Sequence, residues 1–517
     1  MIRYKSIRQQ SLEGFSLPFG GKLNPENRWV KWSLAIPWDE LASGYYKSMS
    51  STQGRPGKDA RLVIGAVIIK HKLNLSDEET VLQILENPYL QYFVGFSSYK
   101  DKPPFTASLF VEIRKRMGSE VFSSFEETIL SCIAAKKKRK TSHSPESSGI
   151  PENHGKMVVD ATVAEQAIRY PTDISLLNEA REISERLIDE LYSISGLAKK
   201  PRTYRQQARK RFLAISKKRS PGGKLLRKGI REQLQYLRRN FRHIEMLLDM
   251  IGSRAFPLSH NRQRQYWIIQ QLYDQQYRMY KEKKRRCDDR IVSISQPHVR
   301  PIVRGKASHK VEFGSKLSVS LVDGIALVDH FGWDAFNEST DLIVQIESYK
   351  RRYGWFPEVV LADGIYGTRA NRKYMKGRNI RFGGKPLGRP RKQTVENAKE
   401  LKQAKQQRRQ DALDRIPIEG KFGQGKNGYR LNYVRARTQK TSEAWINSIF
   451  LVMNLMVLLR FCWAQLTGVL KNVQWGLFAD WLAEVLPAIV LLVGHRRNDS
   501  CIEQMTFEDT LSTGFVF

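Results

Sequence analysis

The strand-forming segments of this chain are short and far apart in the sequence, and this spacing constrains its fold more than any other feature. The first, K-M-V-V-D-A-T-V at 156–163, is a valine-rich run of strand length that ends on or just past Asp160. Residues 316–331 alternate apolar and polar side chains across the Asp323-Gly324 pair, which is a strong hairpin signal. A further run, E-V-V-L-A-D at 358–363, again ends on an acid. The sequence therefore predicts a mixed α/β sheet assembled from distant segments.

The chain before the first strand is predicted to be mainly helical. Residues 59–73 have a helical pattern, and Ser76 followed by Glu79 is a capping-box signature that begins a second helix. Farther on, KKKRK and a polar stretch rich in Ser, Pro and Gly indicate a linker. We therefore divide the chain into an N-terminal helical domain at 1–135, a linker at 136–155, a core at 156–170 and 305–460, an insertion at 171–304 and a C-terminal tail at 461–517.

The insertion at 171–304 is predicted to be helical and is strongly basic. Apolar side chains recur at helical spacing in two runs, Ile183, Leu187, Ile188, Leu191 and Ile194, and Leu234, Leu237, Phe241, Ile244 and Leu248. Residues 201–250 contain fifteen Lys/Arg against three Asp/Glu, which is a net charge of +12. This segment is either an arm that grips DNA phosphates or a solvated helix face, and the size of the charge excess favours DNA.

The charge of the whole chain indicates a polyanionic partner. Its 87 Lys+Arg and 52 Asp+Glu leave a net charge of +35, so nucleic acid is the favoured partner and an anionic membrane is second. The apolar segment at 446–459 is shorter than the ~20 residues that span a bilayer, and we interpret it as a buried core helix. The N-terminus lacks the apolar core of a secretory signal, and four cysteines without a CxxC pair argue against both disulfides and zinc. We expect a cytoplasmic, nucleoid-associated protein that does not act at a membrane.

Two acids lie at the ends of predicted strands, where their side chains can meet at one sheet edge. These are Asp160 and Asp363. Converging carboxylates repel unless a cation lies between them, and oxygen ligands without a Cys/His cluster suit Mg²⁺ or Mn²⁺. A pair of such ions clamps the attacking and leaving oxygens of a phosphodiester. A single acid in such a place is more often a turn or capping residue, and two of them together with Glu419 favour a metal site only moderately.

The motifs around these acids resemble a known family. Asp160 in V-V-D-A-T, Asp363 in L-A-D-G-I-Y, and the R-x3-E-x6-K pattern of Arg415, Glu419 and Lys426 resemble the acidic triad of the DDE transposases of bacterial insertion sequences. The insertion-sequence-five group is the most similar. The resemblance also takes in RPGKDARLV, NPYLQYFVGF, KVEFGSKLSVSL and NIRFGGKPLGRPRK, and it extends from about residue 55 to 460.

The resemblance implies an RNase H-like α/β core with an N-terminal helical domain. It also implies metal-dependent cleavage at transposon ends and strand transfer into target DNA. Asp160, Asp363 and Glu419 would hold two Mg²⁺ or Mn²⁺ ions, and Arg415 and Lys426 would hold the scissile phosphate or neutralise its developing charge. The partners would be double-stranded DNA, at the terminal inverted repeats and at the target, and a second copy of the chain in a homodimer. The alternatives are an RNase H-like nuclease without strand transfer and a non-catalytic DNA-binding protein.

The sequence departs from the family pattern at two positions. The pattern begins with a tyrosine three residues before the arginine, and this chain has Ala412 there. Offsets of 4 and 11 would place Arg415, Glu419 and Lys426 on one face of a helix, but Pro417 inside that helix would clash with the carbonyl of a preceding turn. We therefore expect the charged helix at 394–414 to stop or kink, and a new helix to begin with Pro417 in its first position.

The remaining candidate DNA contacts are basic residues in two segments. GRPRK at 388–392 resembles the core of a minor-groove hook, although Gly-Arg-Pro is also an ordinary loop sequence. The residues expected to bind DNA are Arg389 and Arg391 in this segment and Arg202, Arg205, Arg209, Lys210 and Arg211 in the insertion.

Overall fold

The structure is a computed structural model that describes residues 15–17, 21–47, 49, 57–138, 153–253, 255–303, 311–389 and 394–462. The chain divides into two compact units, Met1–Leu458 and Leu459–Phe517. Most of the predicted linker, Arg391 and nearly all of the predicted tail lie outside the described residues. The elements below belong to the first unit, apart from the last few residues of the final helix.

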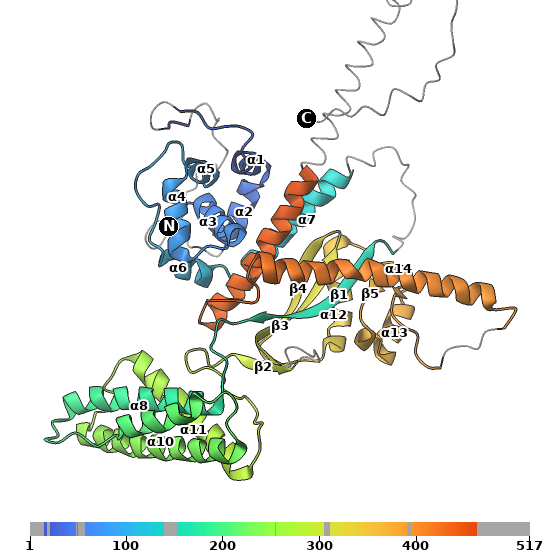
Figure 1. Cartoon of the computed structure of the whole chain (residues 1–517). Helices are drawn as coiled ribbons and strands as arrows, with labels where there is room; N and C mark the ends of the chain where they lie inside the picture. Colours follow the sequence, from blue (N-terminus) through green and yellow to red (C-terminus); the bar gives the residue numbers. More distant parts are fainter. Residues whose placement is uncertain are drawn as a thin grey trace, which may run out of the picture. The chain divides into compact units, whose positions relative to one another are not determined.

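A mixed sheet of six strands has β1 (Lys156–Glu165) at its centre (Figure 1). β1 pairs antiparallel with β3 (Val311–Val322) on one side and parallel with β5 (Val359–Leu361) on the other. β3 also pairs with β2 (Arg300–Val303) and β4 (Ile325–Gly332), and β6 (Arg381–Phe382) extends the sheet beyond β5. The predicted mixed α/β sheet from distant segments is therefore confirmed.

The predicted hairpin joins β3 to β4. Asp323 and Gly324 have φ angles of 52° and 82°, the left-handed backbone that a tight two-residue hairpin turn requires. The prediction for β1 was wrong at its C-terminal end, because the strand continues past Asp160 to Glu165. Pairing with the long strand β3 over this whole stretch explains the extension, since each added residue gains a backbone partner.

Helices precede the sheet, as the sequence predicts. Ser76 accepts a hydrogen bond from the backbone N–H of Glu79, which confirms the predicted N-cap. The helix predicted at 59–73 is capped by Asp59 and has a buried Ile-rich core segment. The helices before the sheet are α1 (Arg28–Ala35), α2 (Trp38–Tyr46), α3 (Ala60–Leu73), α4 (Asp77–Glu86), α5 (Pro88–Phe93), α6 (Leu109–Arg116) and α7 (Ser119–Lys138).

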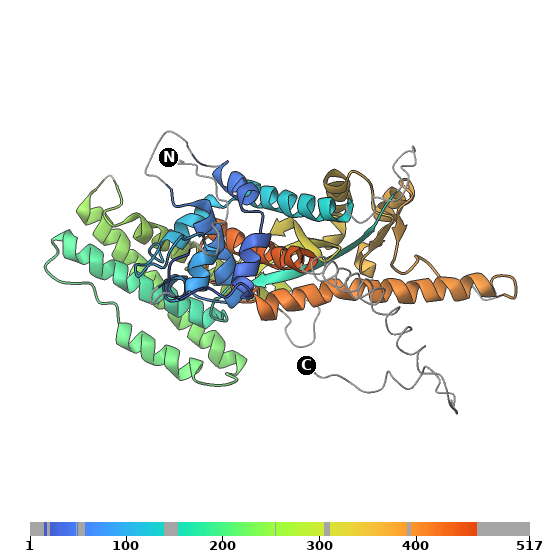
Figure 2. The same cartoon turned by 90° about the horizontal axis from the view of Figure 1, so that it is seen from above.

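Four helices lie between β1 and β2 in the sequence, and Figure 2 shows them as a bundle. They are α8 (Asp173–Ser195), α9 (Arg205–Ser216), α10 (Gly223–Ile251) and α11 (His260–Glu282). The apolar runs of the sequence analysis form a large part of their shared core, although Ile194 remains 49% exposed. The bundle leaves the sheet at Glu165 and returns at Arg300, and both of these residues pair with Gly314 of β3.

The helices after β4 pack on the sheet. Met157 and Val159 of β1 share a core with α12 (Leu342–Tyr353) and α13 (Arg369–Lys376). α14 (Ala398–Gly423) packs against β1 and β5, with an ion pair between Lys156 and Asp414 at 2.5 Å. Residues on one face of a strand alternate with those on the other, so Lys156 and Asp160 face α14 rather than α12.

The apolar segment near the C-terminal end of the described chain is longer than the sequence analysis predicted. It forms one helix, Gln439–Cys462, which has the length and composition that could span a membrane. In its most apolar window 72% of the residues are buried inside the protein, as in a core helix. This burial agrees with the interpretation of residues 446–459 as core.

Candidate active site

Asp160 lies in β1, and Asp363 follows the end of the neighbouring parallel strand β5 by two residues. β1 and β5 pair from Lys156 with Val359 to Val158 with Leu361, and the same register continued by two residues brings Asp160 level with Asp363. Asp160 is partly buried in the middle of β1, and Asp363 is exposed just after β5. The two acids that the sequence selected are therefore brought together by the register, although Asp160 is not at a strand end.

Each of these carboxylates is oriented by the backbone that follows it. Asp160 Oδ1 accepts a hydrogen bond from the N–H of Ala161 at 2.8 Å. Asp363 Oδ1 accepts one from the N–H of Gly364 at 2.6 Å, at the start of a short 3-10 helix, η4 (Gly364–Tyr366). One oxygen of each side chain is thus held by its own loop or strand, which fixes the direction of the second oxygen.

Tyr366 is a buried residue that lies close to both acids. Burial raises the pKa of this tyrosine, and the carboxylates of Glu338, Asp160, Asp341 and Asp363 raise it further. Its side chain is completely buried, and within the described residues its hydroxyl has no hydrogen-bond partner. Four acids therefore lie within electrostatic range of one buried phenol.

The sequence analysis missed two of these acids because neither ends a strand. Glu338 begins a short 3-10 helix, η3 (Glu338–Thr340), and Asp341 directly follows it. Glu338 forms an ion pair with Lys316 at 2.8 Å. Asp341 accepts a hydrogen bond from Ser318 at 2.6 Å and lies 2.9 Å from His330 Nδ1. The segment N-E-S-T-D is acidic, but nothing in its spacing distinguishes it from an ordinary helix start.

Glu419, the third predicted acid, is not gathered with the two aspartates. Its carboxylate forms an ion pair with Arg415 one turn earlier in α14, at 3.0 Å, and its side chain is 56% exposed. Within the described residues no three acidic, histidine or cysteine side chains are close enough together to hold a metal ion. The structure thus brings together Asp160 and Asp363 and leaves Glu419 with its own arginine.

The expectation of a helix break at Pro417 is wrong. α14 continues without interruption from Ala398 to Gly423, and a π-helix, η5 (Gln424–Gly428), follows it directly. Pro417 is exposed, and Leu413, whose carbonyl loses its partner, is 51% exposed. Water can hydrogen-bond that carbonyl, and the buried side of α14 at Asp411, Ile418 and Lys421 holds the helix on the sheet.

The two predicted phosphate-binding cations both have acidic partners. Arg415 pairs with Glu419 within α14. Lys426, in the π-helix, lies 3.5 Å from Glu165 at the end of β1 and 3.3 Å from Glu312 of β3. Lys426 therefore lies beside two acids of the sheet.

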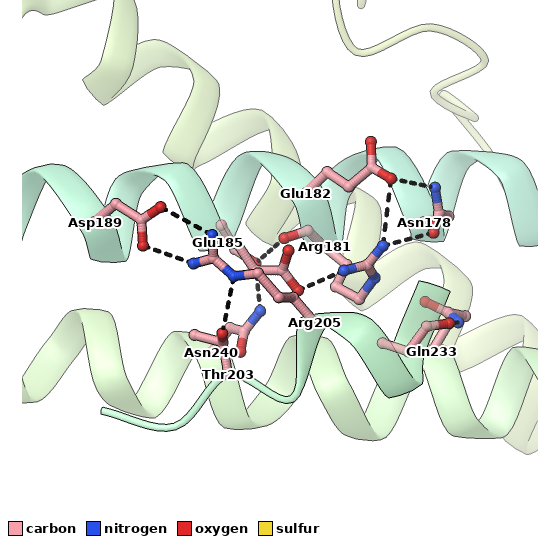
Figure 3. A network of polar contacts seen from close by, with 11 residues as sticks. Asn178, Arg181, Glu182, Glu185, Asp189, Thr203, Arg205, Gln233 and Asn240 are labelled. Atoms are coloured by element: carbon pink, nitrogen blue, oxygen red, sulfur yellow. Dashed lines mark hydrogen bonds and ion pairs between the residues drawn. The ribbon is translucent and has the colours of Figure 1, made fainter. Parts of the chain in front are cut away.

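The basic residues predicted to bind DNA differ in their partners. Arg205 forms a bidentate ion pair with Asp189 (Figure 3), and Arg211 lies 3.4 Å from Glu232. Arg202 lies over the ring of Tyr204. Arg209, Lys210 and Arg389 are exposed.

Comparison with known proteins identifies the family to which this chain belongs. Residues 360–456, which include Asp363 and Glu419, match the model of a transposase DDE domain, and residues 18–116 match a transposase domain called DUF772. A Rhizobium meliloti protein named "Uncharacterized protein ORF8 in nfe locus" is 34% identical over 167 residues, which are 32% of this chain and 74% of that protein. No solved structure matches. The chain therefore belongs to the transposases that carry a DDE domain.

Proposed function

We propose that this transposase cleaves DNA phosphodiesters at transposon ends and joins the new 3′ ends to target DNA. The observation that carries the proposal is the register of β1 and β5, which brings Asp160 level with Asp363. Glu419 lies on α14, which packs against the same two strands. We further propose that this sheet is the RNase H-like core that the resemblance implies.

A divalent metal fits the donor set of this site. The candidate ligands are carboxylate oxygens, which Mg²⁺ and Mn²⁺ prefer. Two further acids, Glu338 and Asp341, lie with Asp160 and Asp363 within electrostatic range of the buried Tyr366. Asp160, Asp363 and Glu419 would hold two ions. When bound, such ions activate the attacking oxygen and stabilise the leaving oxygen of an in-line displacement.

The pairing of Glu419 with Arg415 suggests how DNA and metal would be linked. Glu419 must leave Arg415 to serve as a ligand, and the guanidinium is then available for a phosphate oxygen. This exchange costs little free energy, because exposed ion pairs contribute only ~0–1 kcal/mol to stability. In this proposal Arg415 binds the scissile phosphate, while Lys426 orients the strand ends through Glu165 and Glu312 and neutralises charge nearby.

The proposed partners are double-stranded DNA and a second copy of the chain. The net charge of +35 supports DNA as the polyanion, through the terminal inverted repeats and the target site. In the insertion, Arg202, Arg205, Arg209, Lys210 and Arg211 are proposed to bind phosphates, and Arg389 and Arg391 to reach the minor groove. Arg205 and Arg211 would have to exchange their carboxylate partners for phosphates.

The test uses the DNA that flanks the gene, on a plasmid, with Mg²⁺ and with EDTA. We expect Asp160→Asn, Asp363→Asn and Glu419→Gln each to abolish cleavage while changing DNA binding only a few-fold, because binding rests on Lys/Arg contacts to phosphates. Glu400→Gln, an exposed acid in the first turn of α14, is the matched control and should cleave normally. Near-normal cleavage by one of the three variants would remove that residue from the site.

A second experiment separates transposition from simple hydrolysis. A pre-cut transposon end with a free 3′-hydroxyl is incubated with a target plasmid. Joined products support strand transfer, whereas cleavage of intact ends without any joining supports the nuclease alternative. An absence of Mg²⁺-dependent nicking in either assay would favour the non-catalytic DNA-binding protein.

A further inference from the structure

One face of α10 carries a row of arginines. Arg227, Arg231, Arg238 and Arg242 are spaced by 4, 11 and 15 residues from the first, so they lie within about 60° of one another around the helix. All four are exposed, and no acid falls on this face between them. With a rise of 1.5 Å per residue the row extends over about 22 Å. We call these four residues the arginine row.

Tyrosines of α11 hold two members of the arginine row in place. Arg238 Nε donates a hydrogen bond to the hydroxyl of Tyr273 at 2.9 Å, and its guanidinium lies 5.3 Å from the ring centre of Tyr277. Arg227 lies 4.3 Å from the ring centre of Tyr280 and donates a hydrogen bond to the backbone carbonyl of the same residue. Both guanidinium groups are therefore oriented before any ligand binds.

The partners of the arginine row are neutral, which distinguishes it from other arginines of the bundle. Arg181, Arg205, Arg262 and Arg290 each form an ion pair with a carboxylate of α8. Within the described residues no member of the arginine row forms such a pair. A tyrosine hydroxyl or ring positions a guanidinium without cancelling its charge. The row thus keeps its full positive charge for an anionic partner.

The tyrosines also present an aromatic surface beside this charge. Tyr273 and Tyr277 are stacked, with ring centres 5.8 Å apart and planes inclined by 8°. Tyr273 is anchored by an edge contact with Phe241 of the bundle core. Tyr277 is 38% exposed, so part of its surface is open to solvent. A rigid, partly exposed ring next to oriented arginines is the combination that binds unpaired nucleotides, because every base can stack on such a ring.

We propose that the arginine row and Tyr273, Tyr277 and Tyr280 bind single-stranded DNA. The arginines contact successive phosphates, and an unpaired base stacks on Tyr277. A base in a duplex already has both faces covered by its neighbours, so the tyrosine contributes only where strands are separated. The proposal goes beyond the proposed cleavage and strand transfer, and it can be tested by binding in EDTA, where a failure of catalysis has no influence.

The experiment measures fluorescence anisotropy of the full-length protein with a labelled single strand of about 16 nucleotides and with its duplex. Tyr277→Ala should weaken binding of the single strand by about 5- to 150-fold, which corresponds to the stacking of one base, and should leave duplex binding unchanged. Tyr277→Phe keeps the ring and should bind as the unmodified protein does. Equal binding of the single strand by the alanine variant would overturn the stacking role.

The arginines are tested by salt dependence. Arg227→Ala with Arg238→Ala should lower the log–log salt slope for the single strand by about 1.4, or ~0.7 for each phosphate that is no longer neutralised. Arg264→Ala with Arg278→Ala is the matched control, because these exposed arginines lie on another side of α11. Unchanged helical circular dichroism would show that the bundle is intact.

Two outcomes would refute the site: an unchanged salt slope in the folded double variant, or a decrease of the slope in the control variant that is as large. A loss of duplex binding as large as that of the single strand would refute the preference for single strands.

Discussion

Glu126 is expected to make the stability of this protein depend on pH near neutrality. Arg352 of α12 forms an ion pair with the buried Asp329 of β4 at 2.6 Å and lies 3.9 Å from Glu126 of α7. Two carboxylates thus share one guanidinium, and Asp329 is the closer. Burial raises the pKa of Glu126 from 4.5 to about 7, with Arg352 opposing this shift and Asp329 and Glu127 adding to it.

The sign and size of the effect follow from this pKa. The folded protein holds the Glu126 proton more tightly than the unfolded chain, so the stabilisation is complete below pH 4.5 and is lost as the pH rises through about 7. Each unit of pKa shift corresponds to 1.36 kcal/mol, which gives an upper limit of about 3 kcal/mol. Glutamine cannot ionise, so Glu126→Gln should be more stable than the unmodified protein at pH 8 by up to this amount and should lose the advantage at pH 4.

The assay is urea unfolding followed by tryptophan fluorescence at several values between pH 4 and pH 8. Glu120→Gln removes the same charge from an exposed residue in the first turn of α7 and serves as the control. We expect the curve for Glu126→Gln to diverge from the other two as the pH rises. Parallel curves over the whole range would show that Glu126 ionises as an ordinary surface acid and would refute the reasoning.

Three further predictions concern the bundle and α14. Arg181 is almost completely buried with Glu185, so Arg181→Met should destabilise the protein by ~3–5 kcal/mol in urea unfolding, whereas adding Glu185→Leu should restore most of the loss. An additive loss in the double variant would contradict this. Pro417→Ala restores a helical N–H and should stabilise the protein by up to ~3 kcal/mol in the same assay, and no gain would mean that α14 is adapted to proline. The third variant replaces four arginines of the insertion together: Arg202, Arg205, Arg209 and Arg211. The log–log salt slope of its binding to duplex DNA should fall by about 0.9 for each phosphate that is no longer neutralised. An unchanged slope would show that these arginines face solvent.

Local patterns made the elements of this fold predictable. Ser76 before an acidic turn, the Asp323-Gly324 pair and the apolar periodicity of α8 and α10 each act through neighbouring residues, and the structure confirms all of them. The end of β1 was mispredicted because strand length depends on the partner strand. Pro417 was mispredicted for a similar reason: its effect depends on whether the carbonyl it frees faces water.

The site was predictable only in part. Asp160 and Asp363 were selected because each was predicted to end a strand, and β1 and β5 are indeed neighbouring parallel strands. Their role as metal ligands stays a prediction. The sequence shows that Glu419 and Arg415 are four residues apart, but it does not show that the two would pair with each other. Ion pairs formed by long side chains depend on which partner is nearest in space, and this also explains the carboxylates found beside Arg205 and Lys426.

The attachment of the helical bundle has a consequence for how this chain folds. Glu165 and Arg300 both pair with Gly314, so the two ends of the bundle lie on either side of a single strand, about 10 Å apart. In an unfolded chain, pairing β1 with β3 would require closing a loop that contains the whole bundle. A bundle that folds first brings its own ends together. This leaves only the link from Arg300 to Gly314 to close, and about three halvings of the loop length lower the entropy cost of closure by about 2 kcal/mol. Synthesis delivers the bundle before β3, so the order of translation favours this route.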